Sequence, residues 1–359
     1  MKIGSREIGG GEAPYIVCEI GANHMGSLDR CLETMEAAKR SGADACKLQA
    51  YTAETITLNC DRDEFFIKDG PWKGKRLWDL YKKCETPFEW FPWIAEHAKA
   101  IGIEWFASVF DPSSVDMLEK LKCPAYKIAS FEITDIPLIR YAARTGKPVI
   151  LSTGMANQHD ILKALGAVAN VYADGSWLGD VGTGPVVLHC VSGYPAKTSD
   201  YNLGKMRRYS PLYGVSDHTL GLEVPIAATA LGACMVEKHF RLEGVNSEDE
   251  AFSLQPAAFA RMVKAVYETW SAMQESEEVT TESVHKAYRR SLFVVQDIKK
   301  GEVFSYENVR SIRPGHGWPP DTIDKIVGNK ATRDIERGEP LKLEMFERVL
   351  RPMENADGK

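Results

Sequence analysis

The chain has 359 residues, of which 44% are hydrophobic and 26% are charged, and its net charge at pH 7 is −6. This balance excludes a strongly basic surface of the kind that binds nucleic acid or anionic lipid, so we expect neither partner. No apolar stretch approaches the roughly 20 residues that span a bilayer, and the first residues do not resemble a secretory signal. Eight scattered cysteines without a CxxC pair indicate reduced thiols, and we expect a cytoplasmic protein.

Eight short apolar runs alternate with segments of helical periodicity. Most of the runs are apolar throughout and do not alternate with polar residues, which is typical of parallel strands covered on both faces. Eight such units in about 270 residues predict an α/β fold, a (β/α)8 TIM barrel. An open doubly wound sheet is the alternative, but no G-x-G-x-x-G motif follows the first run. The runs lie at 15–20, 45–49, 104–109, 125–129, 148–151, 185–189, 212–215 and 234–237, and the helical segments at 28–41, 88–101, 113–121, 136–145, 158–169, 221–231 and 256–273.

Two parts of the chain depart from this alternation. An insertion at 52–87 is rich in aromatic residues, and a loop of that length at the face of a barrel is usually functional. After the helical segment at 256–273 the sequence becomes polar and then β-prone, and the pattern Asp-Ile-x-x-Gly-Glu occurs twice, 37 residues apart. We therefore predict a catalytic barrel over 1–275, a linker over 276–287 and a small β-rich domain over 288–350.

Polar residues gather where the predicted strands end, and in a barrel these ends meet at the face that holds the active site. Each residue alone has an ordinary structural explanation, such as a salt bridge or a charge at a helix start. Seven of the eight strands, however, deliver ionisable or hydroxyl groups to this face, and burying so many without a ligand is costly. The residues are Glu19, Lys47, Gln49, Lys127, Ser130, Glu132, Ser152, Tyr194, Ser216, Asp217, His218, Glu237, Lys238 and His239.

Two subsets of these residues indicate the kind of ligand. Lys47 and Lys127, together with the serine hydroxyls, suit a small dense anion that carries phosphate and carboxylate groups. His218 and His239 end neighbouring strands within reach of one divalent ion, although a structural histidine pair explains their spacing equally well. Two histidines with few other protein ligands favour an exchangeable ion such as manganese over structural zinc.

Motifs spread in order over nearly the whole chain resemble those of the sialic acid synthases. They are EIGANHMG (19–26), KLQAY (47–51), KIASFE (127–132), STGM (152–155), SGYPA (192–196), SDHT (216–219) and EKHF (237–240). SIRPGHG (311–317) resembles the antifreeze-protein-like SAF domain of the same family. The resemblance implies a TIM barrel followed by a SAF domain, in a domain-swapped homodimer where each SAF domain caps the partner's barrel.

The resemblance also implies a reaction and roles for single residues. Enzymes of this family condense phosphoenolpyruvate with an N-acetylated amino sugar to give a nine-carbon 2-keto acid and phosphate. The implied metal ligands are His218 and His239, with Mn2+ as the ion and Mg2+ or Co2+ as alternatives. Phosphoenolpyruvate would be held by Lys47, Lys127, Ser130, Ser152 and Ser216, and the sugar by Glu19, Gln49, Glu132, Tyr194 and Arg313 of the second chain. The catalytic base is one of Glu19, Glu132 and Asp217, and the sequence does not choose among them.

Within the family, three features resemble the pseudaminic acid synthases. They are the insertion at 65–90, Phe131 in place of a small residue, and Ser192 where N-acetylneuraminate synthases commonly have Asn. The implied sugar is 2,4-diacetamido-2,4,6-trideoxy-L-altrose, and a less polar pocket built with Phe131 and Trp72 or Trp78 would suit it. N-acetylneuraminate, legionaminate and spore-coat polysaccharide synthases remain as alternatives.

Two rival classes make different predictions. A Schiff-base aldolase using Lys47 or Lys127 would tolerate chelators and be trapped by borohydride. A barrel that only binds carbohydrate would keep its affinity after His239→Ala. Asp249 and Glu250 receive no role from the sequence.

Overall fold

The computed structural model describes residues 1–173, 184–274 and 284–346. The chain forms two compact units, Met1–Gln274 and Glu275–Lys359. Most of the predicted linker, at 276–283, and the end of the predicted second domain, at 347–350, lie outside the described residues. No helix in the part of the chain that is described has both the length and the apolar character needed to cross a bilayer.

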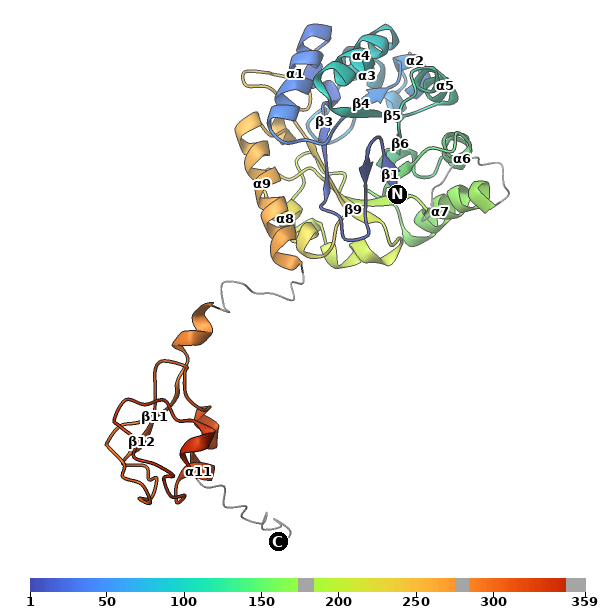
Figure 1. Cartoon of the computed structure of the whole chain (residues 1–359). Coiled ribbons are helices and arrows are strands. Elements are labelled where there is room, and N and C mark those ends of the chain that lie inside the picture. Colours follow the sequence, from blue (N-terminus) through green and yellow to red (C-terminus); the bar gives the residue numbers. More distant parts are fainter. Residues whose placement is uncertain (174–183, 275–283, 347–359) are drawn as a thin grey trace. The chain divides into compact units, whose positions relative to one another are not determined.

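The first unit is a closed barrel of parallel strands, in the order β10-β3-β4-β5-β6-β7-β8-β9 (Figure 1). The barrel closes where β10 pairs with β3, and this register sets His239 opposite Glu19. The predicted barrel is thereby confirmed. The strands are β3 (Tyr15–Glu19), β4 (Ala45–Ala50), β5 (Glu104–Val109), β6 (Tyr126–Ile128), β7 (Val149–Ser152), β8 (Val186–Cys190), β9 (Tyr213–Asp217) and β10 (Met235–His239).

Helices surround the strands in a ring (Figure 1). Local chemistry explains several of their ends: the Ser27 side chain caps α1, that of Asp111 caps α5, and Gly102 closes α4 with a φ of 70°. The predicted helix at 88–101 begins with a 3-10 turn, Phe88–Trp90. The helices are α1 (Leu28–Arg40), α2 (Ala53–Ile56), α3 (Leu77–Cys84), α4 (Phe91–Ile101), α5 (Pro112–Lys120), α6 (Ile136–Arg144), α7 (Gln158–Ala173), α8 (Glu223–Ala230) and α9 (Pro256–Met273).

A short hairpin of β1 (Lys2–Ile3) and β2 (Arg6–Glu7) lies at the end of the barrel where the strands begin. Arg6 pairs with the carboxylate of Asp44, just before β4, and the backbone N–H of Ser5 donates to Glu104 at the start of β5. This hairpin was not predicted, because strands of two residues are too short to show periodicity. The predicted site residues belong to the opposite end of the barrel, where the strands end.

The second unit is built around an antiparallel pair, β11 (Ser291–Val294) and β12 (Val309–Ile312), and includes a short helix, α11 (Ile323–Ile326). The two copies of Asp-Ile-x-x-Gly-Glu pair with each other, since Ile298 and Ile335 exchange backbone hydrogen bonds of 2.9 and 2.8 Å. The unit has a small core of its own, which includes Leu292, Phe304 and Ile326. The repeat seen in the sequence is thus a structural pairing.

Candidate active site

Three buried side chains, of Lys47, Lys127 and Ser216, surround the carboxylate of Glu237 at the mouth of the barrel. The Lys127 Nζ lies 3.1 and 3.0 Å from the two carboxylate oxygens of Glu237, and the Lys47 Nζ lies 3.7 Å from one of them. The Ser216 hydroxyl donates to the same carboxylate at 2.9 Å. These residues come from β4, β6, β9 and β10, so the closed barrel brings together groups that are up to 190 residues apart, Lys47 and Glu237.

Neighbouring charges oppose the effect of burial in this cluster, and they outweigh it at Glu237 and Lys47 but not at Lys127. Burial would raise the pKa of the Glu237 carboxyl, but the charges of Lys127 and Lys47 outweigh it and lower that pKa to about 2. Burial also works against the charge of Lys47, yet Glu19 and Glu237 raise the pKa of its amine. Burial, reinforced by Lys47, lowers the pKa of Lys127 against the opposing pull of Glu237. The two lysines therefore form a cationic pair with one carboxylate between them.

Glu19 and Gln49 stand beside this pair. The Lys47 Nζ lies 2.7 Å from one carboxylate oxygen of Glu19, and the Gln49 amide donates to the other at 2.7 Å. The Lys47 amine also donates to Ser108 at 3.1 Å. Both oxygens of Glu19 are thus occupied.

Several buried polar atoms nearby have no hydrogen-bond partner among the described residues: Ser152 Oγ, Ser192 Oγ and Glu132 Oε2. Such atoms cost stability unless a ligand or water satisfies them. Gly154 has Ser130 and Ser192 against it, and a Cβ at this glycine would stand only 2.2 Å from the Ser192 hydroxyl oxygen. The hydroxyls of Ser152 and Ser192 are therefore available as donors beside Gly154, where no side chain fits. Hydroxyl donors at an open backbone suit an anionic ligand.

Burial also changes the acidity of Glu132. Loss of water around the carboxyl raises its pKa to about 7; Asp135 adds to the rise, while a backbone hydrogen bond and Lys127 oppose it. A carboxyl group that titrates near neutrality can accept a proton from water and later return it. Of the three carboxylates considered as the base, Glu132 therefore has both an unpaired oxygen and a suitable acidity.

The two histidines lie side by side, with ring centroids 5.3 Å apart. The His218 Nδ1 is 2.9 Å from the carbonyl oxygen of Val191; as the donor of that bond it leaves the Nε2 lone pair free. The buried His239 Nδ1 has no hydrogen-bond partner in the described part of the chain, and the nearest carboxylate, Asp249, is 3.5 Å away. No cluster of three or more His, Cys, Asp or Glu residues suited to a metal occurs among the described residues. The pair fits an ion that takes most of its ligands from substrate or water.

Three aromatic rings form a wall beside the histidines. The Tyr194 ring centroid lies 4.4 Å from that of His218, and the Phe252 ring lies 4.8 Å from His239. Trp72, from the 52–87 insertion, packs on Tyr194 at 5.6 Å. The insertion thus reaches the predicted site, as expected from its length.

Three residues named from the sequence stand apart from this group. Asp217 is fully buried on the face of β9 opposite to Ser216, where it pairs with Lys238 and accepts hydrogen bonds from Thr219. Phe131 is exposed. Arg313 belongs to the second unit.

Sequence reasoning placed Glu237 at the barrel mouth and used Ser192 as a feature of the family, but it assigned no function to these two residues or to Asp249. A signal for Glu237 was available, because residues two apart on a strand share a face and His239 faces the site. Asp249 accepts the backbone N–H of Ala22 at 2.9 Å and faces His239, but it lies in a loop whose path the sequence does not reveal.

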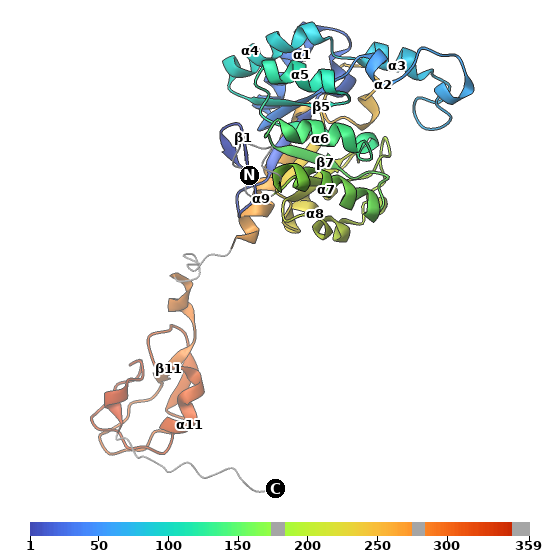
Figure 2. The same cartoon turned by 90° about the vertical axis from the view of Figure 1, so that its right-hand side faces the viewer.

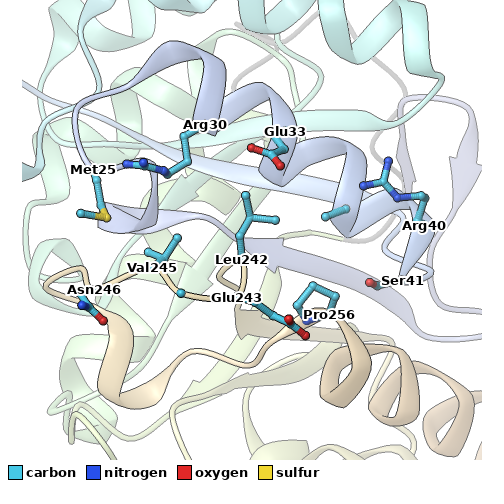
Figure 3. Close-up of a pocket in the computed structure, with 12 residues that line it drawn as sticks. Met25, Arg30, Glu33, Arg40, Ser41, Leu242, Glu243, Val245, Asn246 and Pro256 are labelled. Atoms are coloured by element: carbon cyan, nitrogen blue, oxygen red, sulfur yellow. The ribbon is translucent and has the colours of Figure 1, made fainter.

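A separate cavity of about 600 Å3 lies between α1 and the loop after β10 (Figure 3). Arg30, Glu33 and Arg40 line one side, and Leu242 and Val245 line the other. None of the predicted site residues lines it. Several of the buried polar atoms without a hydrogen-bond partner among the described residues, on Ser152, Ser192, Glu132 and His239, are instead at the barrel mouth, and this is why the site is placed there.

Comparison with known proteins places the chain in a family. Residues 34–278 match the model of the NeuB family, and residues 289–347 match that of the SAF domain. The pseudaminic acid synthase of Helicobacter pylori is 40% identical over 94% of this chain and 99% of its own length. The pseudaminic acid synthase of Campylobacter jejuni (strain 81-176) is 39% identical over 91% and 95%.

A solved structure shares the architecture. The N-acetylneuraminic acid synthetase of Leptospira borgpetersenii, in complex with citrate, superposes with a TM-score of 0.67 at 28% identity. The match covers 79% of this chain and 94% of the other.

Proposed function

The chain belongs to the NeuB family and is a transferase of that family, and we propose that it is a pseudaminic acid synthase. In this proposal phosphoenolpyruvate condenses with 2,4-diacetamido-2,4,6-trideoxy-L-altrose to give pseudaminic acid and phosphate. The observation that carries the reaction is the buried Lys47–Lys127 pair with unpaired hydroxyls around it, beside two histidines. The identity of 39–40% with pseudaminic acid synthases, over more than 90% of both chains, supports the choice of sugar.

Phosphoenolpyruvate binds at the cationic pair in this proposal. Its phosphate and carboxylate would be held by Lys47 and Lys127 and by the hydroxyls of Ser130, Ser152 and Ser216. Of these three hydroxyls, only that of Ser152 lacks a partner among the described residues, since Ser130 accepts from the Gly154 N–H and Ser216 donates to Glu237. The ligand would supply the hydrogen bond that Ser152 lacks, which favours binding.

His218 and His239 would hold a divalent ion, which we take to be Mn2+, with Mg2+ or Co2+ as alternatives. Such an ion, when bound, supplies Lewis-acid polarisation of the sugar's aldehyde oxygen. The Val191 carbonyl fixes the orientation of His218, and Asp249 is placed to orient His239.

Glu132 acts as the base in the proposed reaction. The enol carbon of phosphoenolpyruvate forms a bond to the aldehyde carbon, which leaves positive charge at C2. Water adds to C2 and gives one proton to the Glu132 carboxylate, which returns it to the alkoxide formed from the aldehyde oxygen. The ketone then forms at C2 as the C–O bond to phosphate breaks, and the remaining hydroxyl proton leaves with the phosphate. Glu19 and Gln49 contact the sugar, together with Tyr194. Asp217 has a structural role here, because Lys238 and Thr219 occupy its carboxylate.

A domain-swapped homodimer completes the site in this proposal, with Arg313 of the second copy reaching the sugar and the enzyme acting in the cytoplasm. Support comes from apolar side chains exposed on four loops around the barrel mouth, which a covering domain would bury. They are Met25, Phe131, Met155 and Leu220, with exposures of 43, 65, 63 and 63%.

A phosphate-release assay with phosphoenolpyruvate and Mn2+ tests the proposal. The sugar panel holds the diacetamido-trideoxy altrose, the corresponding mannose epimer for a legionaminate synthase, and N-acetylmannosamine for an N-acetylneuraminate synthase. We expect the altrose to give the highest kcat/KM, and turnover of N-acetylmannosamine as the best substrate would refute the assignment. A Schiff-base aldolase would instead keep its activity in EDTA and lose it after borohydride.

A further inference from the structure

We propose that Glu248 is a positioning residue for sugar recognition, which anchors the 52–87 insertion so that Trp72 stands against the aromatic wall. The inference rests on the proposed function for the identity of the sugar. Glu248 lies in the loop after β10, one residue before Asp249, and no motif of the sequence assigns it a role.

Three contacts join Glu248 to the insertion. Its two carboxylate oxygens form ion pairs with different lysines: one lies 2.5 Å from the Lys75 Nζ and the other 2.8 Å from the Lys83 Nζ. Its backbone carbonyl accepts the indole N–H of Trp72 at 3.2 Å. The Glu248 side chain is only 12% exposed, and the two lysines keep its pKa low although burial opposes ionisation. One residue of the barrel loop thus holds three points of the insertion.

Other contacts of the insertion are within itself or at its base, where Thr86 bonds to His24 at 3.3 Å and Tyr81 packs on Tyr51 at 5.7 Å. Its hairpin is closed by backbone hydrogen bonds between Ile67 and Lys75 at 2.9 Å and between Gly74 and Ile67 at 2.8 Å. Arg76 pairs with Asp61 and Asp79, which also belong to the insertion. Figure 2 shows α2, α3 and the loop between them projecting from the barrel. Among the described residues, every ion pair between the insertion and the rest of the chain runs to Glu248.

The anchored indole is part of the site wall. Trp72 packs on Tyr194 at 5.6 Å and on Phe252 at 6.2 Å, and these two rings touch the histidine pair. In the described structure Trp78, the other tryptophan considered from the sequence, makes no ring contact with this wall. Loss of the anchor should therefore move an apolar surface on the sugar side of the site.

The anion side should be unaffected by the same loss. Lys47 and Lys127 lie on barrel strands, and their partners Glu19 and Glu237 lie on strands as well. The proposal therefore predicts that loss of Glu248 weakens recognition of the sugar and leaves recognition of phosphoenolpyruvate unchanged.

The test is Glu248→Gln in the full-length chain, which removes the charge and keeps the shape. We expect the KM for the sugar to rise about threefold to tenfold, the range for two partly exposed ion pairs, with the KM for phosphoenolpyruvate changed less than about twofold. The preference for the diacetamido sugar over N-acetylmannosamine should fall by a similar factor. The matched control is Glu268→Gln, which breaks the exposed Lys264–Glu268 pair of α9 and should change neither KM.

Salt gives an independent readout. Because Lys75 and Lys83 are 45 and 71% exposed, added NaCl screens their pairs with Glu248. The sugar is uncharged, so its KM should rise with salt in the wild type and stay nearly flat in Glu248→Gln. The KM of phosphoenolpyruvate, an anion held by lysines, should rise with salt in both proteins. If that variant does not fold, Lys75→Gln and Lys83→Gln test the same anchor from the exposed side.

Two results would overturn the inference: equal rises of both KM values, or an unchanged sugar KM in all three variants. Failure of the proposed function is distinguishable. If the wild type prefers another sugar of the panel, pseudaminate synthesis is refuted, and the effect of Glu248→Gln on the KM of that sugar still decides whether the anchor exists.

Discussion

The carboxyl group of Glu132 should control how the stability of the ligand-free protein depends on pH. Burial raises its pKa from 4.5 to about 7, and one of its oxygens has no hydrogen-bond partner among the described residues. Glu132→Gln removes the titration and keeps the size and shape of the side chain. The comparison between the two proteins therefore isolates the cost of a buried negative charge.

The sign and size of the effect follow from proton linkage. Between pH 4.5 and pH 7 the folded state binds more protons at Glu132 than the unfolded state does, so the free energy of unfolding falls as the pH rises through this window. At 1.36 kcal/mol for each pKa unit, the rise from 4.5 to about 7 corresponds to at most about 3–4 kcal/mol. Glu132→Gln should match the wild type near pH 5 and exceed it in stability above pH 7.

Urea denaturation of the metal-free protein, followed by tryptophan fluorescence from about pH 5 to pH 8.5, measures this difference. Glu268→Gln, an exposed change on α9, is the control and should follow the wild-type curve. If the stability curves of wild type and Glu132→Gln stay parallel over the whole range, the pKa of Glu132 is not raised by burial and the reasoning is wrong. In the proposed reaction kcat/KM of the wild type rises as Glu132 ionises near pH 7, and Glu132→Gln lowers kcat by about 100-fold or more.

Three further predictions concern the barrel mouth. His218→Ala and His239→Ala should each abolish Mn2+ binding in calorimetry while circular dichroism stays unchanged; retained Mn2+ binding in both would place the metal elsewhere. Glu237→Gln leaves two buried lysines without their shared carboxylate and should lower the free energy of unfolding by about 3–5 kcal/mol, part of which inorganic phosphate recovers in urea titrations. Asp217→Asn should destabilise the fold by a similar amount through the unpaired Lys238, with kcat of the folded protein near the wild-type value; a 100-fold loss of kcat in a folded variant would instead make Asp217 catalytic.

Much of the barrel could be predicted because its strands are buried on both faces and appear as continuous apolar runs. The ends of these runs located Lys47, Lys127 and both histidines, since parallel strands must deliver their carboxyl ends to one face. The prediction failed to separate the two faces of each strand end. Ser216 and Glu237 face the mouth while Asp217 and Lys238, one position on, face the helices and pair with each other.

The contacts made by loops were beyond the reach of the sequence. Asp249 reaches His239, and Glu248 reaches two lysines more than 160 residues earlier in the chain. Nothing in local composition encodes such pairings, because they depend on how two long loops fold above the barrel. The N-terminal hairpin was missed for the opposite reason, since its strands are shorter than one period of any pattern.

The carboxylate of Glu237 has a consequence for turnover. With this resident counterion in place, an arriving anion shares Lys47 and Lys127 with a group that never leaves. When the anion binds, the two lysines divide their hydrogen bonds between it and Glu237. The free energy of binding is therefore smaller than it would be if the lysines had no carboxylate partner. In the proposed reaction the same lysines must release inorganic phosphate after every cycle. A moderate affinity for anions weakens the binding of phosphoenolpyruvate, but it also speeds the release of phosphate.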